Sequence, residues 1–239
     1  MVTGMVTTVA RWPVKSMAGE RGVALRLDRR GIAGDRAHAL TEPHEGRVRR
    51  LTVRQVPRLL AWSAAYADAP DDALGLGELP LPRLTAPDGT TFRWDDPALP
   101  GALAHDLGRP VGLHRDPALQ QDLGDSILVT TQASLEALGS ALGCTLDLRR
   151  FRTNLHVALD APAFAEEGWE GRRLRVGGTV LDLLHPCARC VIPTRDPDTA
   201  ARAPEILRWL ARERGTLFGI NARASGPGRI AVGDPVALL

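Results

Sequence analysis

The sequence predicts a mixed α/β protein that is mainly β, with a β-barrel of short strands and a few helices at its edges. Three observations support this fold class. Strand-like runs are short and numerous, and glycine or proline turns separate them. Only a few stretches have helical spacing. From about residue 41 to residue 116 the texture of the sequence changes, with frequent Pro and Asp, which indicates a separate and smaller α/β unit.

The N-terminal part predicts two strands joined by a turn-rich loop. Residues 5–12 and 22–28 alternate apolar and polar side chains and contain β-branched residues. Residues 13–20 between them contain Pro, Gly and Ser and therefore predict a loop. The glycine-containing segment 31–36 follows, and then the apolar run 37–40.

Within the smaller unit, two local signals are clear. Pro87-Asp-Gly-Thr90 is a hairpin turn signal, and residues 98–108 could form a short helix. After this unit, residues 127–130 form a short apolar strand. Thr131 is then a suitable N-cap for a helix over 132–142.

The C-terminal part predicts several closely spaced strands and one amphipathic helix. Pro204 to Gly215 has apolar residues at helical spacing, with Glu205 early and Arg214 late, as the helix dipole prefers. The expected strands lie near 154–159, 172–176, 179–184, Gly228 and Gly233.

Bulk composition excludes some partner classes. The chain has 239 residues, of which 44% are hydrophobic and 24% charged, an ordinary globular mixture for one large domain or two small ones. The formal net charge is only +2, so no global field favours nucleic acid or an anionic membrane.

Cysteine usage favours a reducing compartment. Three cysteines cannot form a disulfide framework in a chain of this length. The sequence contains no leader-like segment before the first strand and no apolar run long enough to span a bilayer. We therefore expect a cytoplasmic location, with thiols that are reduced and available as ligands.

Cys187 and Cys190 have the spacing of metal ligands, but the pair alone leaves three interpretations open. A structural zinc site usually needs four ligands, and neither a second Cys-x-x-Cys nor a His pair at ligand spacing is present. A redox dithiol usually begins a helix, and Pro193 argues against that. The third interpretation is a pair of small residues packed on a loop.

The basic residues offer a pocket for a phosphorylated group. Of 30 basic residues, Lys15 is the only lysine, and a compact ammonium differs from a guanidinium in reach and hydration. Lys15, Arg36 and Arg152 lie on loops or strand ends, with Ser16 and Asn154 as neutral donors beside them. Arg and Lys on convergent loops suit a phosphate and a heterocycle. Each residue alone could equally be a solvated surface charge.

Taken together and in order, these motifs resemble the MOSC domain family, and in particular its branch with the mitochondrial amidoxime-reducing component and its bacterial relatives. The resemblance covers essentially the whole chain. It implies a MOSC-type β-barrel built from residues 1–40 and 117–239, with the smaller α/β unit 41–116 inserted between them. The matching segments are Trp12-Pro-Val-Lys-Ser16, Gly34-Asp-Arg36, Phe151-Arg-Thr-Asn154, Pro186-Cys-Ala-Arg-Cys190, Thr194-Arg-Asp-Pro-Asp-Thr199 and Gly228-Arg-Ile-Ala-Val-Gly-Asp-Pro-Val236.

The resemblance also implies a cofactor and its site. In the family the second cysteine of the pair binds the metal of a molybdenum cofactor, which implies Cys190 as ligand and catalytic residue, with Cys187 as a neighbour. A loosely matching loop adds Asp125 and Ser126. The remaining residues implied for the pterin and its phosphate are Lys15, Ser16, Arg36, Arg152, Asn154, Ala188 and Arg189.

Two positions depart from the family pattern. Thr153 stands where the family often has Pro, which leaves the flanking polar groups in place. Ala200 stands where a Gly usually follows Asp-Pro-Asp-Thr. If that Gly has positive φ in the family, the loop here must differ or be strained.

The function implied is that of a molybdenum-cofactor-dependent oxidoreductase that reduces small N-hydroxylated or N-oxide compounds. The electrons are expected from a separate reductase or ferredoxin, because three cysteines cannot supply a four-cysteine cluster once Cys190 is committed. The alternative is a carrier of molybdenum cofactor or sulfur without turnover, although the chain has no pyridoxal-phosphate domain to generate that sulfur.

Overall fold

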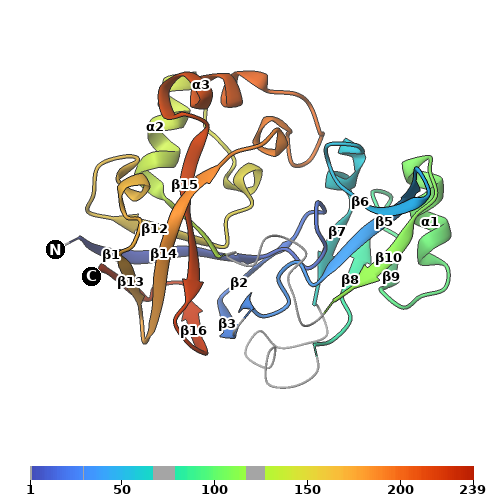
Figure 1. Ribbon diagram of the computed structural model, residues 1–239, viewed down its shortest axis with the longest axis horizontal. Coiled ribbons are helices and arrows are strands. Elements are labelled where there is room, and N and C mark those ends of the chain that lie inside the picture. The colour runs from blue at the N-terminus through green and yellow to red at the C-terminus, as the bar shows by residue number, and fades with distance from the viewer. Residues whose placement is uncertain (1, 29, 67–78, 117–126) are drawn as a thin grey trace.

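A computed structural model describes residues 2–28, 30–66, 79–116 and 127–239. Figure 1 shows the two parts of the molecule side by side. Strands from both ends of the chain form one part, and the middle of the chain forms the other. The N- and C-termini lie close together on the barrel side, because β1 (Thr3–Arg11) and β17 (Pro235–Leu238) pair as antiparallel neighbours.

In the described part of the chain, seven strands form a closed ring. The order is β12, β11, β15, β14, β13, β17 and β1, and β1 pairs again with β12. β2 (Glu20–Gly22) pairs antiparallel with the last three residues of β1, Val9–Arg11. The remaining strands of the ring are β11 (Ile127–Thr131), β12 (Leu155–Leu159), β13 (Arg173–Val176), β14 (Thr179–Ala188) and β15 (Leu217–Ala224).

The barrel closes around an apolar core, because its strands place aliphatic side chains inward. Val129, Val157, Leu181 and Ile220 are all fully buried in one cluster. A second, three-stranded sheet of β16 (Gly228–Ala231), β3 (Ala24–Asp28) and β4 (Gly31–Ile32) adds Leu25 and Ile230 to the same core. The predicted mainly β barrel is therefore confirmed.

The middle of the chain forms two three-stranded sheets and one helix around a core of its own. Trp62 and Trp94 lie in this core with aliphatic residues from both sheets. The predicted hairpin at 87–90 is present, since the Ala86 N–H donates to the Thr90 carbonyl at 2.8 Å. The elements are β5 (His38–His44), β6 (Arg47–Leu51), β7 (Ser63–Ala65), β8 (Arg83–Thr85), β9 (Thr91–Arg93), α1 (Leu99–Leu107), β10 (Gly112–Arg115) and the 3-10 turn η1 (Pro57–Ala61).

Two helices cover the barrel at one end. α2 (Gln132–Leu142) begins where the Thr131 side chain accepts a hydrogen bond from the Ser134 N–H. It ends at Gly143, whose φ of 68° glycine tolerates without strain. α3 (Pro204–Arg214) and α2 share one apolar cluster. In it, the rings of Phe151 and Phe218 stack with centroids 4.1 Å apart. The predicted helices are confirmed.

Two strands differ from the sequence prediction. Residues 217–224 have no clear strand pattern, yet β15 lies in the ring between β11 and β14. β14 was expected to end near residue 184 but continues to Ala188. Pro186 is tolerated there because the register with β15 shifts on both sides of it. The cysteine segment therefore begins on a barrel strand.

The division of the chain at residues 40 and 116 stays a prediction.

Among the described residues, no helix is both long enough and apolar enough to cross a bilayer.

Candidate functional site

Arg36 joins three segments that are far apart in the sequence. It lies in the turn between β4 and β5, and its N–H donates to the Trp12 carbonyl at 2.8 Å. Its guanidinium reaches the Arg152 carbonyl and the Asn154 Oδ1, each at 3.4 Å, and forms an ion pair with Asp35. The turn at 34–36 is thereby fixed against both the end of β1 and the start of β12.

Arg152 makes a second set of contacts across the same place. It follows the 3-10 turn η2 (Leu148–Phe151), and its Nη1 donates to the Met17 carbonyl at 2.6 Å. Its guanidinium lies over the Trp12 ring, 4.3 Å from the centroid. A cation over an indole face is attracted by the ring quadrupole. Arg152 is thereby held against the loop that carries Lys15 and Ser16.

The cysteine segment joins this group through Arg189. Its Nη2 donates to the Phe151 carbonyl at 2.7 Å, and its Nη1 lies 3.1 Å from the Cys187 sulfur. Its backbone N–H donates to the Thr216 carbonyl at 2.8 Å. Its Nε is buried without a hydrogen-bond partner among the described residues. Cys190 follows, half-buried, and no hydrogen bond links its thiol to the described part of the chain.

Lys15 and Ser16 lie on the loop between β1 and β2. The Lys15 N–H donates to the His38 carbonyl at 2.8 Å, and the Ser16 hydroxyl accepts from the Val53 N–H at 3.3 Å. The Lys15 side chain is half-buried, whereas Ser16 is fully buried. The hydrogen bonds to His38 and Val53 thus hold this loop against the smaller unit, and Arg152 holds it against the barrel.

Three of the predicted site residues have a strained backbone conformation. Seven described non-glycine residues have positive φ, and three of them are Ser16 at 72°, Arg36 at 50° and Arg152 at 54°. A side chain disfavours this left-handed region, and such strain persists at functional sites where the surroundings over-determine it. The strain at these three positions is consistent with a functional role.

Asn154 hydrogen-bonds to backbone groups of two barrel strands. Its Nδ2 donates to the Ala10 carbonyl and its Oδ1 accepts from the Leu128 N–H, both at 3.2 Å. The side chain is fully buried and joins β1 to β11. Its contact with a cofactor stays a prediction. Asp125 and Ser126 lie outside the described residues, so their predicted role is not addressed by the structure.

The electrostatics of the group centre on Asp35. Burial raises the pKa of the Asp35 carboxyl above its ordinary value, and the adjacent Arg36 guanidinium opposes this. The carboxyl also accepts the Trp12 N–H at 2.6 Å. Asp35 thus anchors both Arg36 and the end of β1.

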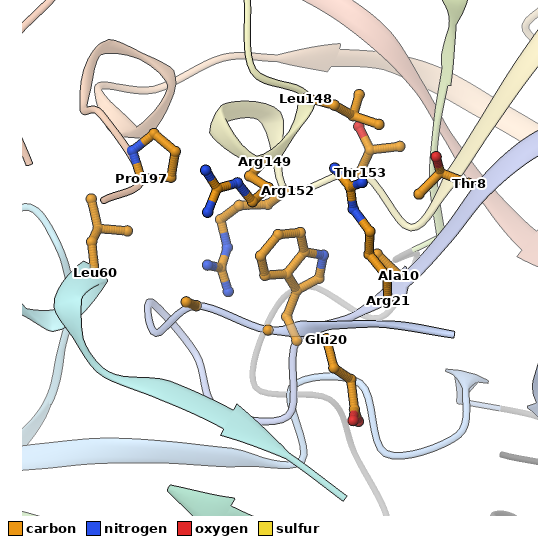
Figure 2. A pocket seen from close by; sticks show the side chains of 13 residues that line it. Thr8, Ala10, Glu20, Arg21, Leu60, Leu148, Arg149, Arg152, Thr153 and Pro197 are labelled. Carbon is orange, nitrogen blue, oxygen red and sulfur yellow. The ribbon is translucent and has the colours of Figure 1, made fainter. Parts of the chain in front are cut away.

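A small cavity of about 90 Å³ lies directly beside Arg152. In Figure 2, Leu148, Arg149 and Thr153 lie on one side of it, and Ala10 and Glu20 on the other. Trp12 lines it too, and the indole Nε1 is buried without a partner among the residues described. The sequence did not predict Trp12 and Arg149 as lining residues, although Trp12 begins the segment Trp12-Pro-Val-Lys-Ser16.

Ion pairs join the loop after the cysteines to the 3-10 turn η2. Arg150 contacts Asp196, and Arg149 contacts Asp198, both at 2.7 Å. Asp196 also accepts the Thr199 N–H at 2.9 Å. In the described ranges there is no group of three or more His, Cys, Asp or Glu placed to hold a metal ion.

Ala200 provides a direct stability test of this loop. Its φ is 58°, so the loop keeps the left-handed conformation and the side chain strains it. We expect Ala200→Gly to raise the free energy of unfolding by about 0.5–1 kcal/mol, measured by denaturant titration. Ala201→Gly is the matched control and is expected to lower it by a similar amount. Equal destabilisation by both would contradict the assigned strain.

Comparison with known proteins gives two family matches. Residues 116–237 match the model described as the MOSC domain, and residues 3–91 match the MOSC N-terminal beta barrel domain. Mitochondrial amidoxime-reducing component 1 of Homo sapiens is 33% identical over 125 residues, which cover 47% of this chain and 36% of that protein. Component 2 of Macaca fascicularis is 31% identical over 123 residues, which cover 46% of this chain and 36% of that protein.

The matched region thus spans about a third of those relatives. Among solved structures, the YuaD protein from Bacillus subtilis aligns with 100% of this chain and 97% of its own. Its TM-score is 0.50 and its sequence identity is 12%, so this likeness concerns the fold alone.

Proposed function

The chain belongs to the MOSC domain family, and we propose on that premise that it binds a molybdenum cofactor and reduces N-hydroxylated or N-oxide compounds. The observation that supports this most is the convergence of four distant segments. Side-chain hydrogen bonds from Arg36, Arg152 and Arg189 join the loop after β1, the turn before β5, the segment after η2 and the cysteine segment. These are the segments that the motifs single out.

The residues present fit a phosphorylated, sulfur-rich cofactor. Arg189 has a buried Nε without a partner among the described residues, and such a donor is costly to leave unpaired. Cys190 offers a half-buried thiol beside it. A thiolate suits a thiophilic metal, and cations with neutral donors suit a phosphate and a pterin edge.

Each residue then has a separate task. Lys15 and Arg152 would hold the phosphate, and Ser16 would orient the adjoining loop. The N–H of Arg189 on the Thr216 carbonyl fixes the backbone that presents Cys190. Cys190 must lose its proton to bind a metal. The bound cofactor would supply the two-electron redox chemistry.

The overall reaction is a two-electron reduction. An N–OH group with two electrons and two protons gives N–H and water. We propose that a separate reductase or ferredoxin supplies the electrons to a small-molecule substrate, and that this takes place in the cytoplasm.

A combined metal and activity measurement tests the proposal. Protein made in a host that synthesises the cofactor is expected to hold about one molybdenum per chain by elemental analysis. It is also expected to reduce benzamidoxime to benzamidine with reduced viologen as electron donor. Both should be absent from protein made in a host that lacks the cofactor pathway.

The two readouts separate the alternatives. Full molybdenum content without any benzamidoxime reduction would favour the carrier function. Zinc in place of molybdenum, in protein from the competent host, would rule out both and favour a structural metal site.

A further inference from the structure

An open hollow of about 650 Å³ lies directly beside the cysteine segment. Its lining comes from residues 53–54 after β6, residues 191–195 after the cysteines, and residues 202–211 at the start of α3. In Figure 1 the chain that leads to α3 lies between the barrel and the smaller unit, where these segments approach.

The hollow borders the proposed cofactor site on two sides. Val191 lines it and is the residue after Cys190. Val53 also lines it, and the Val53 N–H donates to the Ser16 hydroxyl. A molecule in the hollow would therefore lie next to the cysteine that we assign to the metal.

The charged residues that line the hollow are all arginines. Arg54, Arg195, Arg202 and Arg208 contribute to it, and no Asp or Glu does. Of these, Arg54, Arg202 and Arg208 are exposed and form no ion pair with any residue that the structure describes. Glu205 lies on the same helix but is not part of the lining.

Neighbouring arginines on the same side of the barrel behave differently. Arg149 and Arg150 are paired with aspartates, and Arg214 is paired with Glu167. Like charges around one concavity repel each other unless an anion lies between them. The arrangement therefore favours a negatively charged ligand.

The rest of the lining is apolar. Val53, Pro204 and Leu207 contribute hydrocarbon walls. The volume is in the range of small-molecule sites, roughly 300–1,000 Å³. Guanidinium groups bind carboxylate or phosphate through paired donors. The chemistry therefore suits a small molecule with an apolar body and an anionic group.

We propose that this hollow admits the substrate and selects N-hydroxylated compounds that carry a carboxylate or phosphate. The proposal rests on the proposed function and names its substrate class. An acidic protein is the other negatively charged occupant, but the concave shape, the apolar walls and the adjacency to Cys190 favour a small molecule.

A matched pair of substrates and a matched pair of variants test this. The substrates are benzamidoxime and 4-carboxybenzamidoxime, with reduced viologen as donor. We expect wild type to prefer the carboxylate, and the variant R202Q/R208Q to lower the ratio of the two kcat/KM values by about tenfold. Arg212→Gln removes an exposed charge from α3 outside the hollow and should leave the ratio as in wild type.

Binding without turnover gives an independent readout. Calorimetry with 4-carboxybenzamidoxime, in the absence of any electron donor, should show about tenfold weaker binding to R202Q/R208Q. Carboxylate binding that needs these arginines, in a protein without reductase activity, would support the hollow and defeat the proposed function.

Two results would overturn the inference while the proposed function stands. One is reduction of both substrates with a ratio that R202Q/R208Q does not change. The other is a lower turnover of R202Q/R208Q that appears only when a protein supplies the electrons. That result would assign the arginines to docking of an acidic protein.

Discussion

Cys190→Ser is expected to abolish molybdenum retention, whereas Cys187→Ser keeps most of the metal. A cysteine thiol loses its proton to a bound metal far more easily than a serine hydroxyl does, and the thiolate is a soft ligand that suits such a metal. Elemental analysis of both variants, made in the same cofactor-competent host, measures the effect. Reductase activity should fall with the metal in Cys190→Ser.

The structure makes the comparison between the two cysteines sharper. Arg189 donates to the Cys187 sulfur at 3.1 Å, so Cys187 is the better hydrogen-bonded of the two. Cys187→Ser should keep a hydrogen bond to Arg189, because a hydroxyl oxygen also accepts. Cys144→Ser, at an exposed position, is the control for the change of residue type. Equal loss of metal in Cys187→Ser and Cys190→Ser would refute the assignment to Cys190.

Much of the fold could be predicted because its signals are local. The caps of α2, Thr131 and Gly143, act within one turn of the chain, and the hairpin at 87–90 depends on its own turn residues. β15 could not be predicted in this way. Gly219 interrupts its pattern, and its place in the ring depends on pairing with β11 and β14, which are distant in sequence.

The candidate site, too, could be predicted from the sequence only in part. The motifs single out Lys15, Arg36 and Arg152 because of their residue types and order, and the structure places their segments in contact. The motifs could not indicate that Asn154 is committed to backbone groups, since that depends on how β1 and β11 approach each other. They also gave no sign of the arginine-lined hollow, whose members come from three separate segments.

His38 is a buried residue beside the site that sequence reasoning did not single out. It is fully buried, and neither ring nitrogen has a hydrogen-bond partner among the described residues. Its ring packs edge-on against Trp94, with centroids 4.6 Å apart. Burial, and to a lesser degree the charge of Arg115, lowers the pKa of His38 from 6.5 to about 3.

This buried ring should make the protein sensitive to acid. The unfolded chain takes up the proton near pH 6.5, but the folded protein does so only near its lowered pKa of about 3. The unfolded state therefore binds more protons between these values, and stability falls as the pH decreases, by about 1.4 kcal/mol for each pH unit. Burial also lowers the pKa of His156, to about 4, so a second ring acts in the same direction.

His38→Leu isolates the contribution of His38. We expect its free energy of unfolding, relative to wild type, to shift by about 2 kcal/mol in favour of the variant between about pH 7 and about pH 5. Denaturant titrations at several pH values measure this difference. His114→Leu, at an exposed position of β10, should follow the wild-type curve. A difference between His38→Leu and wild type that stays constant with pH would mean that His38 does not stay neutral in the folded protein.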